Sequence, residues 1–206
     1  MSKTIVFDFG GVLFEWRPAK LLQRALPQHA IDEASAAVWA RRFFQDYQGD
    51  WGEFDRGRLD IDTLVPRIVA RTGLEAAEVH GVIAAIADEL QPRGDTVALL
   101  RRLHGAGRPL HFLSNMPAPY ADHLDATHDF LGCFASGVYS GRVGMVKPEP
   151  AIFELAAQRF GAPAADLVFL DDHEPNVTAA RACGWQALHF TDAARAEAEL
   201  RERGWI

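Results

Sequence analysis

The sequence predicts an α/β protein with a parallel sheet, helices on both faces of that sheet, and a small α-helical cap domain. Two observations predict this fold class. Short apolar runs alternate with amphipathic helical segments, which is the pattern of a parallel sheet, and residues 18–90 interrupt the alternation with a pattern that is helical throughout. We therefore expect residues 1–16 and 91–206 to form the core domain and residues 17–90 to form the cap domain.

The first expected strand organises the chain. Residues 5–7, Ile-Val-Phe, form an apolar run typical of a strand buried on both faces. Asp8 follows at once, and a carboxylate is costly to bury unless it is paired or binds a metal. Gly10 and Gly11 come next, and glycines let the backbone turn sharply and approach a ligand. Because ligands bind at the carboxyl ends of strands in open α/β sheets, Asp8 is a candidate site residue; the alternative is that it caps a turn.

Three further strands are expected in the second part of the chain. They cover residues 110–113, 167–170 and 186–190. The first of these ends in Ser114-Asn115, and the second leads directly into Asp171-Asp172. The Gly-rich segment 136–145 is predicted to be hairpin-like. Helices are expected from the N-cap residue Asp95 to Gly105 or Gly107, and over about residues 150–160, 175–183 and 192–202.

About four helices are expected in the cap. They are a short helix that ends at Pro27, one over residues 31–47, one from Asp60 or Asp62 to Gly73, and one over residues 75–90. An aromatic-rich stretch contains Phe43, Phe44, Trp51 and Phe54. We interpret it as the core of the cap, with partial access to a site as the alternative. A second alternative is that these helices only extend the core domain.

Composition excludes some classes of partner. The net charge of −7 argues against nucleic acid, whose backbone needs a basic face. Charged residues interrupt every long apolar stretch and the N-terminus lacks the pattern of a signal peptide, so we expect no membrane partner. Cys133 and Cys183 lie far apart without metal-ligand spacing, which indicates reduced thiols and a cytoplasmic protein. The sequence carries no signal for oligomeric state.

Four polar clusters together form a set suited to phosphoryl transfer. They are Asp8, Ser114-Asn115, Lys147 and Asp171-Asp172. A carboxylate can act as the nucleophile, carboxylate oxygens bind Mg²⁺, and a hydroxyl and a lysine can hold phosphate oxygens. Taken alone, Ser114-Asn115 is an ordinary loop start and Lys147 an ordinary solvated side chain. The adjacent aspartates are more informative, because two carboxylates after an apolar run repel each other unless a cation joins them.

With these motifs the chain resembles the haloacid dehalogenase (HAD) superfamily of aspartate-nucleophile hydrolases. The four clusters match the family's four motifs in order, and the helical segment stands where one subfamily inserts its helical cap. The resemblance implies a Rossmann-like core and a Mg²⁺-dependent phosphatase that acts on a small phosphorylated metabolite.

The resemblance also implies the nucleophile and the metal ligands. Asp8 would be the nucleophile, would form an aspartyl-phosphate intermediate and would bind Mg²⁺, with the Gly10 carbonyl as a second ligand. Asp172 would bind the metal directly, and Asp171 would bind it directly or through water. Asn176 would stand behind the metal or the lysine.

The phosphate-binding residues follow from the same resemblance. Gly11, Ser114, Asn115 and Lys147 would hold the phosphate. Lys147 would also offset the negative charge of Asp8 and of the aspartate pair.

One position departs from the family pattern. Family phosphatases usually carry a second aspartate at the position of Gly10, where it protonates the leaving group. General acid catalysis contributes about 10²–10⁴ in rate, so this change matters most for a poor alkoxide leaving group. Glu15 and His173 are candidates to replace it by their proximity to the motifs; the alternative for each is an exposed or structural residue.

Two other functions stay open at this point. A 2-haloacid dehalogenase would use Asp8 to attack carbon without a metal, but it does not require Asp171-Asp172 and usually carries an aromatic residue where Gly10 stands. A catalytically silent binding or regulatory protein is supported by Gly10 alone and opposed by Asp8, Lys147 and the aspartate pair.

Overall fold

Five parallel strands form the central sheet in the order β3-β2-β1-β4-β5. The computed structural model describes residues 3–206. The strands are β1 (Thr4–Phe7), β2 (Leu110–Ser114), β3 (Ser136–Tyr139), β4 (Leu167–Asp171) and β5 (Gln186–His189). In the central strand β1, Ile5 pairs with Leu110 on one side and with Val168 on the other. The predicted parallel sheet is therefore confirmed, and the polar residues that end its strands share one edge.

Helices cover both faces of the sheet, as predicted. One face packs against α6 (Gly94–Gly105), α7 (Ala118–Thr127) and α10 (Ala193–Glu202), and the other against α8 (Pro150–Phe160) and α9 (Glu174–Ala182). Side chains alternate between these faces, so Ile5 and Phe7 join one hydrophobic core and Val6 joins the other. No helix within residues 3–206 is long and apolar enough to cross a membrane.

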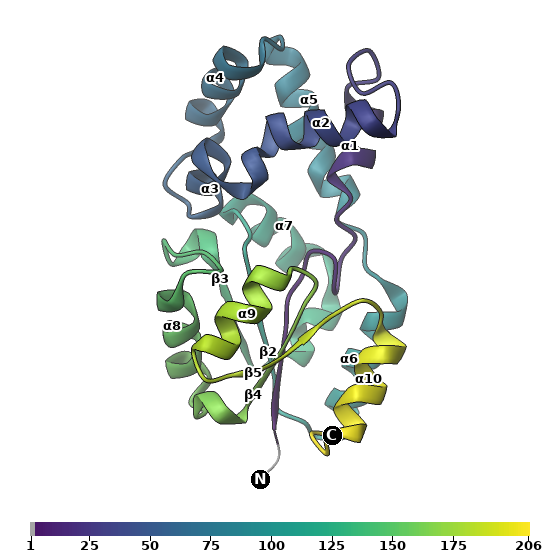
Figure 1. The fold of residues 1–206 in the computed structure, drawn as a ribbon, viewed down its shortest axis with the longest axis vertical. Helices are drawn as coiled ribbons and strands as arrows, with labels where there is room; N and C mark the ends of the chain where they lie inside the picture. Colours follow the sequence, from purple (N-terminus) through teal and green to yellow (C-terminus); the bar gives the residue numbers. More distant parts are fainter. Residues whose placement is uncertain (1–2) are drawn as a thin grey trace.

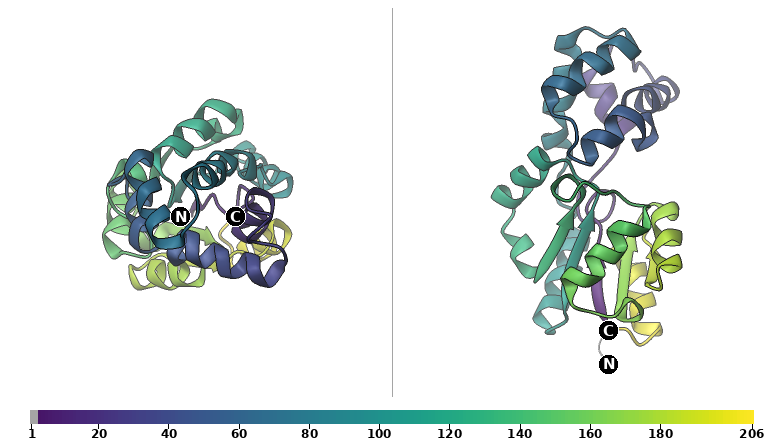
Figure 2. Two further views of the ribbon diagram at one scale, coloured as in Figure 1. Left: turned by 90° about the horizontal axis from the view of Figure 1, so that it is seen from above. Right: turned by 90° about the vertical axis from the view of Figure 1, so that its left-hand side faces the viewer.

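The remaining five helices lie together beyond the carboxyl ends of the strands (Figures 1 and 2). They are α1 (Pro18–Ala25), α2 (Glu33–Phe44), α3 (Gly49–Asp55), α4 (Ile61–Thr72) and α5 (Ala76–Glu89), called here the α1–α5 group. Asp60 caps α4 and Gly73 ends it with φ of 76°, as the sequence predicts. The chain enters and leaves the group side by side, where buried Glu89 pairs with Arg17 at 3.0 Å and with Arg24.

Two predictions about this architecture are wrong in detail. Residues 136–145 form no hairpin, because β3 pairs in parallel with β2 and a 3₁₀ turn, η3 (Ser140–Arg142), follows it. Gly137 makes the segment read as a turn, but the packing of the sheet requires a glycine there. A Cβ on Gly137 would lie 2.1 Å from the Phe112 ring. The α1–α5 group also holds five helices rather than about four, because α3 was not predicted. Gly49 and Gly52 make α3 a poor helix by propensity, yet a Cβ on Gly52 would lie 2.7 Å from the Tyr47 carbonyl oxygen.

Candidate active site

The predicted motif residues converge at the carboxyl edge of the sheet. Asp8 follows β1, with its N–H bonded to the Leu170 carbonyl at 2.9 Å, and Ser114 and Asp171 are the last residues of β2 and β4. A cavity of about 420 Å³ opens over this edge and is lined by residues of both the core and the α1–α5 group. Its floor includes Asp8, Gly10, Asn115, Lys147, Asp172 and Asn176.

Lys147 lies between two carboxylates. Its Nζ is 2.8 Å from Asp8 Oδ1 and 2.7 Å from Asp171 Oδ2, and all three side chains are buried. Burial alone would lower the pKa of Lys147, but the negative charges of Asp171 and Asp8 outweigh burial and raise it. Lys147 is therefore a fixed cation beside the candidate nucleophile.

Asp171 and Asp172 are adjacent in sequence but differ in their partners. Both oxygens of Asp171 accept hydrogen bonds, from the His173 N–H at 2.8 Å, from Asn176 Nδ2 at 3.1 Å, and from Lys147. Asp172 is more exposed and faces the cavity. Its carboxylate packs directly on Gly11, where φ is 72° and a Cβ would lie 2.1 Å from Asp172 Oδ2. Asp171 thus orients Lys147 and Asn176, while Asp172 keeps oxygens available for a ligand.

Three carboxylates form a potential metal site. Asp8, Asp171 and Asp172 each offer an oxygen, and these atoms lie within 4.8 Å of one another. Burial, together with the charges of Asp171 and Asp172, raises the pKa of Asp8 to about 8 even though Lys147 opposes the shift. A divalent cation favours the ionised carboxylate and prefers such hard oxygen ligands. This donor set fits Mg²⁺, with Asp8 and Asp172 offering the more available oxygens.

Ser114 and Asn115 have different roles in the structure. The Ser114 hydroxyl is buried and has no hydrogen-bond partner within residues 3–206. A buried hydroxyl left in this way is costly, which indicates that a ligand atom completes it. The Asn115 side chain instead bonds the backbone of Lys147, from Nδ2 to the carbonyl at 2.9 Å and from the N–H to Oδ1 at 2.8 Å. Asn115 therefore fixes the loop that carries Lys147, and a direct part in phosphate binding stays a prediction.

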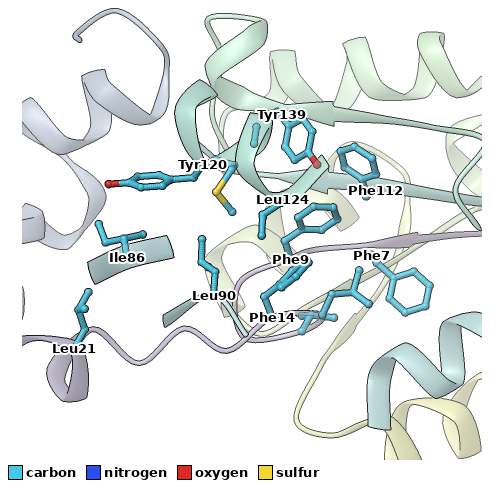
Figure 3. Packing of buried hydrophobic residues seen from close by; sticks show 14 of the residues in the cluster. Phe7, Phe9, Phe14, Leu21, Ile86, Leu90, Phe112, Tyr120, Leu124 and Tyr139 are labelled. Atoms are coloured by element: carbon cyan, nitrogen blue, oxygen red, sulfur yellow. The ribbon is translucent and has the colours of Figure 1, made fainter. Parts of the chain in front are cut away.

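The sequence did not reveal the opposite wall of the cavity. This wall includes the apolar and aromatic residues Trp16, Tyr47, Trp51, Ile86, Leu90, Met116 and Tyr120, with Asp55 beside them. The polar residues Asp46, Gln48, Arg56 and Glu149 line the cavity as well. Figure 3 shows Ile86, Leu90 and Tyr120 together at the junction of the α1–α5 group with the core. The aromatic-rich stretch of the cap was the available signal, and Trp51 from that stretch does line the cavity. Of the two acid candidates, His173 lines the cavity and Glu15 does not.

Comparisons with known proteins agree with this geometry. The haloacid dehalogenase-like hydrolase family matches residues 2–184, so the chain belongs to that family. The chain is 31% identical to the sesquiterpene phosphatase astK of Aspergillus oryzae, over 97% of this chain and 95% of the relative. It is 32% identical to the enolase-phosphatase E1 of Parvibaculum lavamentivorans, over 95% of this chain and 81% of the relative.

A solved structure shows the same fold. The HAD family enzyme bt-2542 of Bacteroides thetaiotaomicron, in a magnesium complex, superposes with a TM-score of 0.71 and covers 97% of this chain and 98% of its own. At 20% identity this likeness concerns the fold alone. The predicted family, the parallel α/β core and the resemblance to the family's phosphatases are confirmed.

Proposed function

We propose that this protein is a Mg²⁺-dependent phosphatase that hydrolyses a small phosphorylated metabolite through an aspartyl-phosphate on Asp8. The observation that carries the proposal is the arrangement around Lys147. A buried lysine joins Asp8 and Asp171, and at the end of the neighbouring strand β2 the buried Ser114 hydroxyl has no hydrogen-bond partner within residues 3–206. Phosphoryl transfer depends mainly on positioning and charge stabilisation, which such a set of fixed donors and charges provides.

In the first half of the reaction, a carboxylate oxygen of Asp8 attacks phosphorus and the bond to the leaving oxygen breaks. Lys147 and the Ser114 hydroxyl hold the non-bridging phosphate oxygens, and backbone N–H groups near Gly11 and Asn115 complete that set. In the second half, water attacks phosphorus and releases Asp8. Asp171 keeps Lys147 in place throughout, since both of its oxygens are already engaged by protein donors.

Asp8, the Gly10 carbonyl and Asp172 would hold Mg²⁺ directly, with Asp171 and Asn176 behind them. When bound, the ion neutralises charge on the phosphate and keeps Asp8 ionised. We assign Asp171 the indirect role because its oxygens already accept hydrogen bonds from three protein groups.

We further propose that the α1–α5 group acts as a cap, as residues 17–90 were predicted to do, and that the alcohol part of the substrate is largely apolar. Trp51, Ile86, Leu90 and Tyr120 line the cavity and are each at least nine-tenths buried. A cavity of about 420 Å³ falls within the usual range of about 300–1,000 Å³ for small-molecule sites. The similarity to a sesquiterpene phosphatase supports the same substrate class.

The test is phosphate release from 4-nitrophenyl phosphate, with and without Mg²⁺, by the wild type and by Asp8→Asn. An aryl leaving group needs no acid, so Gly10 cannot mask the activity. We expect turnover that requires Mg²⁺ and is lost in Asp8→Asn. Turnover that persists without the metal would refute the metal assignment. If the wild type releases no phosphate but releases halide from a 2-haloacid, the protein is a dehalogenase instead. If it releases neither, it is a binding protein.

A further inference from the structure

Asp55 is a buried acidic residue of the α1–α5 group that lines the same cavity as Asp8. It is the last residue of α3 and only 5% exposed. Its carboxyl takes part in no ion pair within residues 3–206, whereas the neighbouring Arg56 pairs with Glu149 and with Glu53. A buried carboxyl without a cationic partner favours its neutral, proton-donating form.

The surroundings of Asp55 support this protonation state. Burial raises the pKa of Asp55 to about 8, and the charge of Arg56 and a hydrogen bond with the Trp51 side chain offset only part of the shift. The pKa of Asp8 is raised as well, but Asp8 pairs with Lys147 and belongs to the carboxylate cluster that would hold a metal ion, so a bound cation would ionise Asp8 and leave Asp55 protonated. A protonated carboxyl and an ionised one in the same site can take different roles. Asp55 would thus present a proton to the cavity where Asp8 presents an oxygen.

Asp55 belongs to the α1–α5 group, yet its backbone is tied to the core. Its carbonyl accepts a hydrogen bond from Ser140 Oγ at 2.6 Å, and the same Oγ accepts the N–H of Met116 at 2.8 Å. Met116 directly follows Asn115, whose side chain holds the backbone of Lys147. This chain of contacts fixes Asp55 relative to the loop that carries Lys147, which general acid catalysis requires.

The chemistry of the site lacks one group that Asp55 can supply. Gly10 stands where a leaving-group acid is expected, and an apolar aliphatic alcohol leaves poorly as an alkoxide. We propose that Asp55 is the general acid and base of this enzyme, an assignment that rests on the proposed phosphatase function. As Asp8 bonds to phosphorus, the bond to the leaving oxygen breaks and the Asp55 proton passes to that oxygen, which departs as the alcohol. The Asp55 carboxylate then takes a proton from the water that attacks phosphorus, and the bond between Asp8 and phosphorus breaks.

The experiment compares a good with a poor leaving group in wild type and Asp55→Asn. 4-Nitrophenyl phosphate needs no acid, whereas decyl phosphate does. We expect Asp55→Asn to lower kcat/KM for decyl phosphate by about 10²-fold or more and to change that for 4-nitrophenyl phosphate by less than about threefold. The base step follows the irreversible release of the alcohol, so its loss lowers kcat for both esters and leaves kcat/KM unchanged. A retained kcat/KM for 4-nitrophenyl phosphate also reports that the variant is folded. Asp50→Asn is the matched control, because Asp50 lies on the same helix, pairs with Arg67 at 3.1 Å and does not line the cavity.

Other outcomes would overturn the assignment. Equal losses on both substrates would mean that Asp55 acts in binding or folding, and no loss on either would exclude it from the reaction. The same selective loss in His173→Asn, with Asp55→Asn active, would assign the acid to His173. Should Asp55→Asn fail to fold, the dependence of kcat/KM on the leaving-group pKa in the wild type and in His173→Asn decides. A steep dependence in the wild type excludes acid catalysis, a shallow one that persists in His173→Asn supports Asp55, and one that becomes steep in His173→Asn assigns the acid to His173. A wild type inactive on both esters would refute the phosphatase function itself.

Discussion

Carboxyl groups line the cavity on two sides, and their surroundings differ. On the sheet side, Asp8 and Asp171 share one buried lysine, and Asp172 lies beside them where a metal can join the set. On the side of the α1–α5 group, Asp55 lies among aromatic rings and has no ion-pair partner within residues 3–206. A carboxylate with cations nearby is stabilised as a nucleophile or ligand, while a carboxyl in an apolar wall is stabilised as an acid. The contrast indicates that the sheet edge handles the phosphate and the opposite wall handles the leaving group.

We expect the largest effect from Lys147→Met, which removes the cation that Asp8 and Asp171 share. Asp8 and Asp171 would then face each other unpaired in a buried site, so we expect a loss of about 3–5 kcal/mol in the free energy of unfolding. Loss of a charged donor to the phosphate should also lower kcat by about 10²–10³-fold or more. Urea unfolding and 4-nitrophenyl phosphate turnover measure the two effects. Lys3→Met is the control, because Lys3 pairs with Asp166 at 3.0 Å near the surface, where such a pair contributes at most about 1 kcal/mol. Similar losses in the two variants would contradict a special role of the buried cation.

The two sides also differ in how much of them the sequence revealed. The strands β1, β2 and β4 were predictable because their apolar runs end in polar residues, and Asp8, Ser114 and Asp171 do share one edge of the sheet. The separate roles of Asp171 and Asn115 were not predictable. They depend on hydrogen bonds to Asn176, His173 and the Lys147 backbone, which only the folded loops create.

The wall opposite the sheet edge carried weaker signals. Two glycines concealed α3, so the sequence placed Asp55 on no element, and no motif distinguishes it from other acidic residues of the chain. Its environment comes from Ser140, Tyr120 and Trp51, which are distant in sequence or lie one helical turn away. Burial of this kind is a property of tertiary packing, and local propensity does not encode it.

A second prediction concerns the pH dependence of stability. The pKa of Asp55 is raised to about 8 in the folded chain and is about 3.9 in an unfolded one. Unfolding therefore releases a proton between these pH values, and the free energy of unfolding falls as pH rises through this window. Asp55→Asn has no such proton to release. The free energy of unfolding of the variant minus that of the wild type should therefore rise by about 3 kcal/mol between pH 5 and pH 8. Urea unfolding at both pH values, in chelator, measures this change, with Asp50→Asn as the reference. A difference that does not vary with pH would show that Asp55 is ionised in the folded protein.

A third prediction tests the metal ligands by a readout other than activity. Mg²⁺ that binds only the folded chain should stabilise the wild type by about 2.7 kcal/mol at one hundred times its Kd. Asp172→Asn should abolish most of this gain, because it removes a carboxylate that lines the cavity and belongs to the three-carboxylate cluster. Asp122→Asn, which affects a surface pair with Arg142 at 2.6 Å, should retain the gain. Thermal unfolding with and without Mg²⁺ measures it; an unchanged gain in Asp172→Asn would exclude Asp172 as a direct ligand.

The smallest expected effect separates the two sides most directly, because it changes only the part of the substrate that the apolar wall contacts. Burial of one CH₂ group contributes about 0.8 kcal/mol, or about fourfold in affinity. Across primary alkyl phosphates of increasing chain length, kcat/KM should therefore rise by up to about fourfold per carbon until the chain fills the cavity. Ile86→Val, which removes one methyl group from that wall, should weaken the response for longer chains and leave 4-nitrophenyl phosphate turnover nearly unchanged. Glycerol phosphate serves as the polar reference. A flat response to chain length would place the alcohol part of the substrate outside this wall, since every ester in the series presents the same phosphate to Lys147 and Ser114.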